Sequence, residues 1–304
     1  MIREHWILGC LVLLLIGCKT PPAAEAPPFI PLELLDAGEE PRSLLRYAIA
    51  EGTTTTSKMS WRVIPSEHGS PTTTVSGLQK MEIHAVIGPA KVDEQEIRYD
   101  FEIVESKAVA GPGASEKLLE DIQVHTDFLK GTGSWNAMDD SGHVRGLRYN
   151  QKAVDVPLRL LWTITNAFSL VSVVALPNEE VGVGARWAVR GMLALHGVKM
   201  VQEAIYTLVE RDGDQVVLDV EFARSGNRQI VEFAEDESSL EVESGQTIAT
   251  GHIRLDLRTL GSHGTATGRI KNKVVFVEEG HREHAEIDES FDFRIESATT
   301  VPAN

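Results

Sequence analysis

The chemically most capable run of side chains in this sequence is His281-Arg282-Glu283-His284. Imidazole and carboxylate groups at such close spacing are the usual ligands of a protein-bound zinc ion. The flanking residues alternate as in a β-strand, and on a strand His281 and His284 point to opposite faces. The two histidines therefore cannot share one ion, and their spacing is not that of a helical zinc-protease site. We expect a solvated strand edge here and no metal site.

Other candidate catalytic patterns are incomplete. The segment 113–117 lacks the second glycine of a serine-hydrolase elbow, and the segment 181–185 lacks the third glycine, the helix and the lysine of a nucleotide-binding loop. The run 139–142 lacks the ligand series of a calcium loop, and a hairpin turn accounts for it. His252 and His263 have carboxylates within sequence reach, but no spacing singles out an acid–base pair. We therefore predict no enzymatic activity and no cofactor.

The only two thiols lie near the start of the chain, at Cys10 and Cys18. Arg3 begins a short basic region, and residues 6–16 form an apolar stretch that is too short to span a bilayer. Leu15-Ile16-Gly17-Cys18 follows, and this run resembles the lipobox of bacterial lipoproteins. The resemblance implies that residues 1–17 are a signal peptide and that Cys18 is acylated and becomes the mature N-terminus. The alternative is an ordinary secretory signal with a chance cysteine.

The resemblance to lipoproteins also implies a location. Residues 18–43 would be a lipidated cysteine followed by a tether, because six of the thirteen prolines lie between residues 19 and 41. Lys19 follows the acylated cysteine, and Gram-negative lipoproteins that lack an aspartate there are sorted to the outer membrane. We therefore expect an outer-membrane lipoprotein that faces the periplasm, with exposure at the cell surface as the alternative.

The charge of the chain narrows the range of partners. The formal net charge is −16, and removing residues 1–17 leaves it unchanged because Arg3 and Glu4 cancel. A nucleic-acid-binding protein needs clustered basic residues, so we expect no nucleic-acid partner. The same balance argues against a polybasic membrane patch. The N-terminal lipid is then the expected contact with the membrane, and no protein partner can be named.

Period-two alternation dominates the rest of the sequence. Apolar residues alternate with charged residues in segments 58–63, 97–103, 253–258 and 287–295, as expected for antiparallel strands with one solvated face. Asp212-Gly213 lies between the apolar segments 206–209 and 216–219 and predicts a tight hairpin turn. We predict a mainly β (α+β) fold with a large curved antiparallel sheet or half-barrel of about ten strands. One domain would span residues 44–298, and residues 299–304 would be a tail.

Two segments depart from this period and predict helices that pack on the sheet. Residues 114–130 place apolar side chains at three- and four-residue spacing, although a strand at 122–126 is the alternative. Residues 157–175 begin with a proline suited to a first helical turn and are apolar around most of the circumference. Arg159 and several hydroxyl residues argue against a membrane span. We therefore expect the second helix to be buried against the sheet.

This outline resembles the LolA/LolB-like lipoproteins, in which a curved sheet closed by helices holds acyl chains. Residues 176–187 also resemble segments of uncharacterised bacterial lipoprotein families. The first resemblance implies an apolar ligand, a lipid or acyl chain, between the second helix and the sheet. The ligand-binding residues would be Trp162, Phe168, Trp187, Ile205 and Phe222. The alternatives are an interaction scaffold without a ligand and, less favoured, a hydrolase.

Overall fold

The computed structural model describes residues 32–65, 78–93, 96–110, 120, 123, 126–127, 129–150, 173–195, 198–233, 238–278 and 281–302. Within these residues the chain forms one antiparallel sheet of 14 strands, so the predicted mainly β fold is confirmed, with more strands than the ten expected. The strands are β1 (Leu32–Asp36), β2 (Thr54–Pro65), β3 (Leu78–Ile87), β4 (Lys91–Val92), β5 (Ile97–Ala110), β6 (Gly133–Met138), β7 (Val144–Tyr149), β8 (Arg186–Leu195), β9 (Val198–Asp212), β10 (Gln215–Gly226), β11 (Gln229–Phe233), β12 (Ser238–Asp256), β13 (Ser262–Glu278) and β14 (His281–Thr300).

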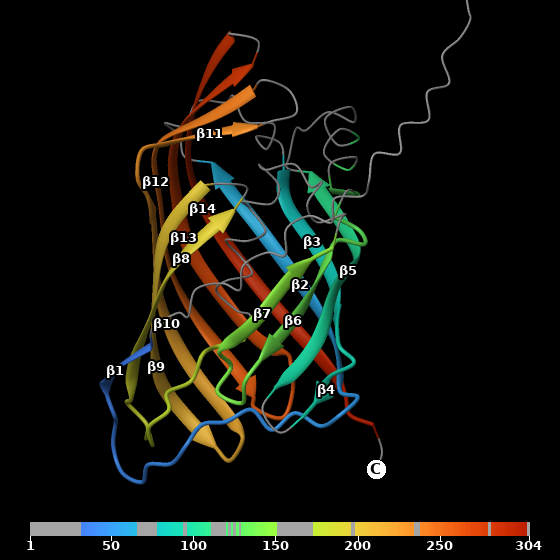
Figure 1. Ribbon diagram of the computed structural model, residues 1–304, viewed down its shortest axis with the longest axis vertical. Helices are drawn as coiled ribbons and strands as arrows, with labels where there is room; N and C mark the ends of the chain where they lie inside the picture. Colours follow the sequence, from blue (N-terminus) through green and yellow to red (C-terminus); the bar gives the residue numbers. More distant parts are fainter. Residues whose placement is uncertain are drawn as a thin grey trace, which may run out of the picture.

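The strand order is β1-β8-β9-β10-β12-β13-β14-β2-β3-β5-β6-β7, with β4 beside β5 and β11 beside β12. Figure 1 shows that the sheet curves strongly, with β8, β9 and β10 on one side and β2, β3 and β5 on the other. At the ends of the path, β1 and β7 each pair with a single neighbour within the described residues. The pairing of β14 with β2 joins the two halves of the sheet.

The inner face of the sheet is the hydrophobic core, and the alternation in the sequence determines which side chains face it. In β2, Met59 and Trp61 are buried while Lys58 and Arg62 are exposed, as predicted. Following the strand register from β1 to β5 identifies one continuous row of inner-face residues. The row is Leu34, Trp187, Tyr206, Val220, Gly251, Ala266, Phe293, Trp61, Met81 and Ala108. All but Leu34 and Gly251 are buried members of the core.

The predicted helices fall largely outside the described residues. Within segment 114–130, Glu120, Gln123, Thr126 and Asp127 are helical, in agreement with the predicted helix. Of segment 157–175, only residues 173–175 are described, and these are not helical. The predicted end of this helix at residue 175 is therefore wrong, and residues 157–172 lie outside the described residues. How it packs stays a prediction.

Two predicted boundaries are wrong. β1 lies inside the segment predicted to be a tether, because Leu32 and Leu34 alternate with Glu33 and pair with β8. The proline-rich composition of the preceding residues obscured this short alternation. At the other end, Thr299 and Thr300 belong to β14 rather than to a tail, since they pair with Thr55 and Thr54 of β2.

The hairpin between β9 and β10 is confirmed, but its turn is shifted by one residue. Asp212 pairs with Gln215, so the two central residues are Gly213 and Asp214 rather than Asp212 and Gly213. Gly213 has a φ of 59°, as the first central position of a type I′ or II′ turn requires.

Replacing Gly213 with valine is expected to lower the free energy of unfolding by about 1–2 kcal/mol, because a β-branched residue is strained at positive φ. A Cβ at this position would meet no atom within 4 Å, so the loss should come from the backbone alone. Gly213→Asn is the control, since asparagine tolerates this conformation, and it should melt close to wild type. Equal melting temperatures for the valine and asparagine variants would contradict the turn assignment.

Candidate functional site

The candidate site lies where two irregular segments cross one end of the sheet. Residues 42–50 run along this end in Figure 1, and residues 173–182 lie next to them. The backbone N–H of Tyr47 donates to the carbonyl of Asp140 at 2.7 Å, and that of Ala48 donates to Leu257 at 2.8 Å. The N–H of Leu176 donates to Ser141 at 2.8 Å. The two segments are thus tied both to the β6–β7 turn and to the turn after β12.

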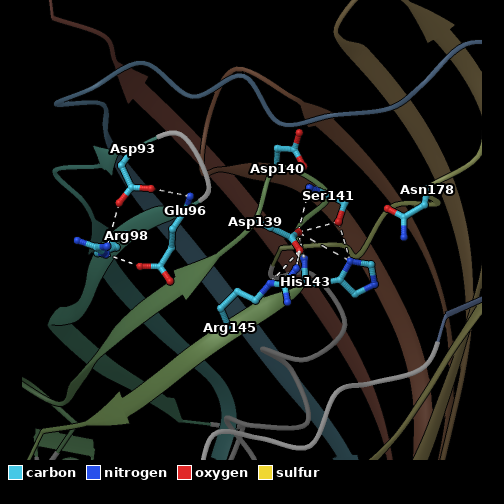
Figure 2. Close-up of a pocket in the computed structure, with 9 residues that line it drawn as sticks. All are labelled: Asp93, Glu96, Arg98, Asp139, Asp140, Ser141, His143, Arg145 and Asn178. Atoms are coloured by element: carbon cyan, nitrogen blue, oxygen red, sulfur yellow. Dashed lines mark hydrogen bonds and ion pairs between the residues drawn. The ribbon is translucent and has the colours of Figure 1, made fainter.

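A polar pocket of about 680 Å³ opens beside the β6–β7 turn (Figure 2). It is lined by Asp93, Glu96, Arg98, Asp139, Asp140, Ser141, His143, Arg145 and Asn178. Its two arginines already have carboxylate partners, since Arg98 bonds Asp93 at 2.9 Å and Arg145 bonds Asp139 at 2.7 Å. These two arginines neutralise only two of the four carboxylates in the lining, which leaves the pocket with a negative balance of charge.

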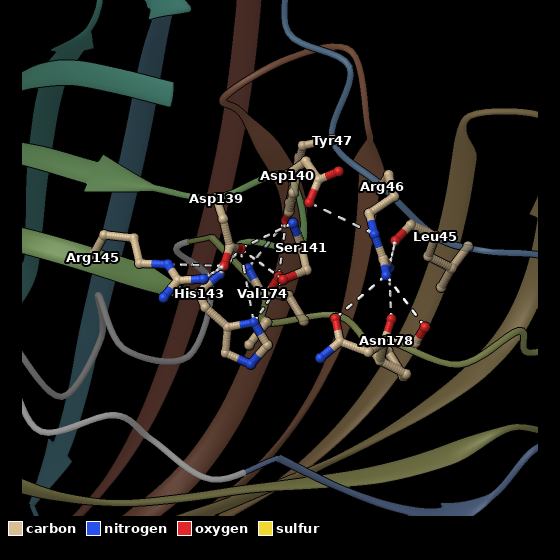
Figure 3. A network of polar contacts seen from close by, with 12 residues as sticks. Leu45, Arg46, Tyr47, Asp139, Asp140, Ser141, His143, Arg145, Val174 and Asn178 are labelled. Carbon is tan, nitrogen blue, oxygen red and sulfur yellow. Dashed lines mark hydrogen bonds and ion pairs between the residues drawn. The ribbon is translucent and has the colours of Figure 1, made fainter. Parts of the chain in front are cut away.

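Asp139 organises the turn that lines the pocket. Its Oδ1 accepts hydrogen bonds from the backbone N–H groups of Ser141 and His143, both at 3.0 Å, and from the Ser141 hydroxyl at 2.6 Å. These contacts radiate from one carboxylate in Figure 3. Burial raises the pKa of Asp139, but the hydrogen bonds from Ser141 and His143 outweigh that effect and hold the pKa below its ordinary value.

The combination of Asp139, Ser141 and His143 contains the residue types of a hydrolase triad but not its geometry. Ser141 Oγ lies 2.7 Å from His143 Nδ1, and its hydroxyl donates to Asp139, so its oxygen accepts the Nδ1–H. In a triad the serine and the carboxylate bond opposite ring nitrogens. Here both lie on the Nδ1 side, with Asp139 Oδ1 at 3.8 Å from that nitrogen. This arrangement stabilises a turn and does not activate the serine.

Arg46 ties the other side of the same network together. Its Nη1 donates to the carbonyl oxygens of Leu45 at 2.6 Å and Pro177 at 2.7 Å, and its Nε lies 3.7 Å from Asp140 (Figure 3). One guanidinium therefore joins the 42–50 segment, the 173–182 segment and the β6–β7 turn. Sequence reasoning missed Arg46 and Asn178, because they lie in irregular segments and belong to no motif.

His143 gives this end of the molecule a pH dependence. Burial is the main cause of its lowered pKa, with the nearby arginines adding to the effect and Asp139 opposing it. The unfolded chain binds this proton as the pH falls through about 6.5, and the folded protein binds it only at a lower pH. Stability should therefore fall as the pH drops below that value.

We expect His143→Asn to flatten the fall in stability between pH 7 and pH 5, since asparagine can still donate to Ser141 and does not titrate. Urea unfolding at a series of pH values measures this slope. Parallel curves for wild type and His143→Asn would contradict the assignment of the pH dependence to this residue.

The predicted ligand-binding residues do not form one group. Trp187 and Phe222 belong to the inner-face core and are almost completely buried. Ile205 lies on the opposite face, because it pairs with Ala188 and Glu221 whereas its neighbour Tyr206 pairs with Trp187. The prediction that Ile205 lines the same site as Trp187 is therefore wrong, because successive residues of a strand point to opposite faces. Cys18, Trp162 and Phe168 lie outside the described residues.

The run His281–His284 lies on a strand, as predicted, since β14 begins at His281. Among the residues that the structure describes, no group of three or more histidine, cysteine, aspartate or glutamate side chains is placed to hold a metal ion. Nor does any described helix combine the length and the hydropathy that crossing a membrane requires.

No protein-family model matches this sequence, and no curated protein matches it. The functional conclusion therefore depends on the residues and their arrangement.

Proposed function

We propose that this protein is a membrane-anchored bacterial lipoprotein with a non-enzymatic role, whose curved sheet holds an apolar ligand of the lipid or acyl-chain class. The observation that carries the proposal is the inner-face row from Trp187 to Ala108, which runs across nine strands of the sheet. Its central members, Gly251 and Ala266, are small, while aromatic residues occupy both sides. Apolar walls of this kind are typical of sites for apolar ligands.

The closed end supports the same proposal. The hydrogen bonds of Arg46 and Asp139 fix the segments that cross one end of the sheet, so the inner face is covered there by protein. A turn network without an activated serine fits a binding role better than hydrolysis. The alternative class is an interaction scaffold without a ligand.

Native mass spectrometry of protein made in bacterial cells tests whether a lipid co-purifies. Titration with the methyl ester of a dansyl-labelled fatty acid then tests whether the inner face binds an acyl chain. Phe222→Ala should change the affinity because Phe222 faces the core, whereas Ile205→Ala, on the other face, should leave it as in wild type. Absence of lipid and of dansyl binding would overturn the carrier role and favour the scaffold.

The proposed anchor is tested separately. Cys18→Ser should convert the protein from a membrane-bound to a soluble form, because the acylated cysteine is the proposed attachment to the membrane. Cell fractionation followed by a carbonate wash measures the partition. Cys10→Ser is the matched control, since Cys10 lies within the proposed signal peptide, and it should stay in the membrane fraction. Retention of Cys18→Ser after the wash would contradict the anchor and favour residues 157–175 as a span.

We place the protein, on the same grounds, in the outer membrane with its body facing the periplasm. Lys19 supports this sorting. Sucrose-gradient separation of the two membranes should recover the protein with outer-membrane markers, and Lys19→Asp should move it to the inner membrane. Recovery of wild type in the inner membrane would overturn the sorting proposal without affecting the anchor.

A further inference from the structure

Two tryptophans lie on the same inner-face row but differ in how their indole N–H groups are used. Trp187 Nε1 donates to the backbone carbonyl of Ala175 at 2.9 Å. Trp61 Nε1 is buried, on a side chain that is 3% exposed, and has no hydrogen-bond acceptor within the part of the chain that the structure describes. A buried N–H without an acceptor costs free energy, and the indole N–H of a buried tryptophan usually has one.

The residues around Trp61 indicate what kind of molecule could carry the missing acceptor. Its ring stacks on Phe291, with centroids 4.5 Å apart and an interplanar angle of 13°, and meets the edge of Phe293 at 6.2 Å. Its partner on the next strand is Met81, which is also fully buried. A lone water needs two to four polar partners, and these neighbours offer none. The missing acceptor therefore fits a molecule that is otherwise apolar.

The charges around Trp61 also limit the chemical class of the acceptor. The neighbours named above carry no cation, and the nearest arginine in sequence, Arg62, bonds Asp292 instead. A carboxylate placed beside Trp61 would be buried without a counter-ion, which is strongly unfavourable. An uncharged ester carbonyl presents an acceptor at much lower cost and continues into an acyl chain that suits the aromatic wall.

We propose that Trp61 is the polar contact of a lipid site on the inner face, where its Nε1–H donates to the carbonyl oxygen of an acyl ester. This inference rests on the proposed function, because it names the chemical class of the ligand that the curved sheet holds. In this arrangement the junction between the headgroup and the acyl chain of the lipid lies next to β2 and β14. Trp187, whose N–H is already bonded, supplies an apolar wall on the other side.

The test compares an ester with an ether. Oleoyl glycerol and its ether analogue, oleyl glyceryl ether, differ in the carbonyl oxygen, and each is titrated in competition with a dansyl-labelled acyl probe. Wild type should bind the ester about fivefold to tenfold more tightly, as one neutral hydrogen bond allows. Trp61→Phe should bind both with the affinity that wild type has for the ether. Trp187→Phe is the matched control and should keep the ester preference.

The outcomes separate this inference from the proposed function. Equal affinities of wild type for ester and ether, or an ester preference that survives in Trp61→Phe, would overturn the inference while leaving a lipid carrier. Binding of neither lipid and no dansyl-probe binding would overturn the proposed function and the inference with it. Melting of the lipid-free variants adds a second readout. Trp187→Phe should lower the melting temperature more than Trp61→Phe, because only Trp187 loses a hydrogen bond, and equal losses would count against the inference.

Discussion

Replacing Trp187 with alanine is expected to lower the free energy of unfolding by about 3–5 kcal/mol, the range for removing a fully buried aromatic residue. The Trp187 side chain is 0% exposed, its ring stacks on Tyr206 at 5.7 Å, and its indole bonds Ala175. The substitution would remove all three interactions and leave a cavity between β8 and the 173–182 segment. Urea unfolding followed by circular dichroism gives the change in free energy.

Trp135→Ala is the control for this prediction, because Trp135 is a tryptophan of the same sheet that is 37% exposed. The guanidinium of Arg148 lies 5.7 Å from its ring centroid, and an exposed cation–π pair contributes about 0.5–1 kcal/mol. The loss in Trp135→Ala should therefore be several times smaller. Similar losses for the two variants would mean that Trp187 is not part of the core.

The second large effect is expected at Gly182, where an added Cβ would meet a closer atom than at any other described glycine. A Cβ at this position would lie 1.7 Å from the carbonyl oxygen of Glu39, which is backbone and cannot rotate away. The N–H of Gly182 also donates to Ala37 at 2.9 Å, so the 173–182 segment and the residues after β1 are held together at this point. Gly182→Ala should cost about 3 kcal/mol through this clash.

Gly184→Ala separates this clash from backbone strain. Gly184 has a φ of 85°, but a Cβ there would meet nothing within 4 Å, so its cost of about 1 kcal/mol is conformational. Thermal unfolding of both variants makes the comparison. If Gly182→Ala melts no lower than Gly184→Ala, the close approach of the two segments is wrong.

The sequence predicted the strands well where alternation is strict and less well where it is not. The segments around Trp61 and Phe293 alternate cleanly, and their faces are as expected. Ile205 was assigned to the wrong face because an apolar residue on the outer face looks like a core residue in the sequence. The number of strands was underestimated for a related reason, since short pairs such as Lys91–Val92 contain too few residues to show a period.

The closed end shows what the sequence could not predict. The run 139–142 was correctly interpreted as a turn, because aspartates followed by glycine favour one. Arg46, which approaches Asp140 of that turn, and Asn178, which bonds Arg46, come from segments without periodicity, and only the folded chain brings them together. That the N–H of Trp61 has no acceptor among the described residues could not be predicted either, since a hydrogen bond here depends on neighbours from other strands.

The seam between β2 and β14 has a consequence for the order of folding. Arg62 and Asp292, which bond across it, are 230 residues apart in the sequence. Contacts of such high sequence separation must repay a large loop-closure entropy, and they are associated with slow folding, on the order of milliseconds to seconds or longer. The half from β8 to β13 can pair through short hairpins first, with β1 and β14 joining its two edges. The pairing of β2 with β14 then forms last. Until it forms, both halves of the sheet expose unpaired strand edges that chaperones can bind.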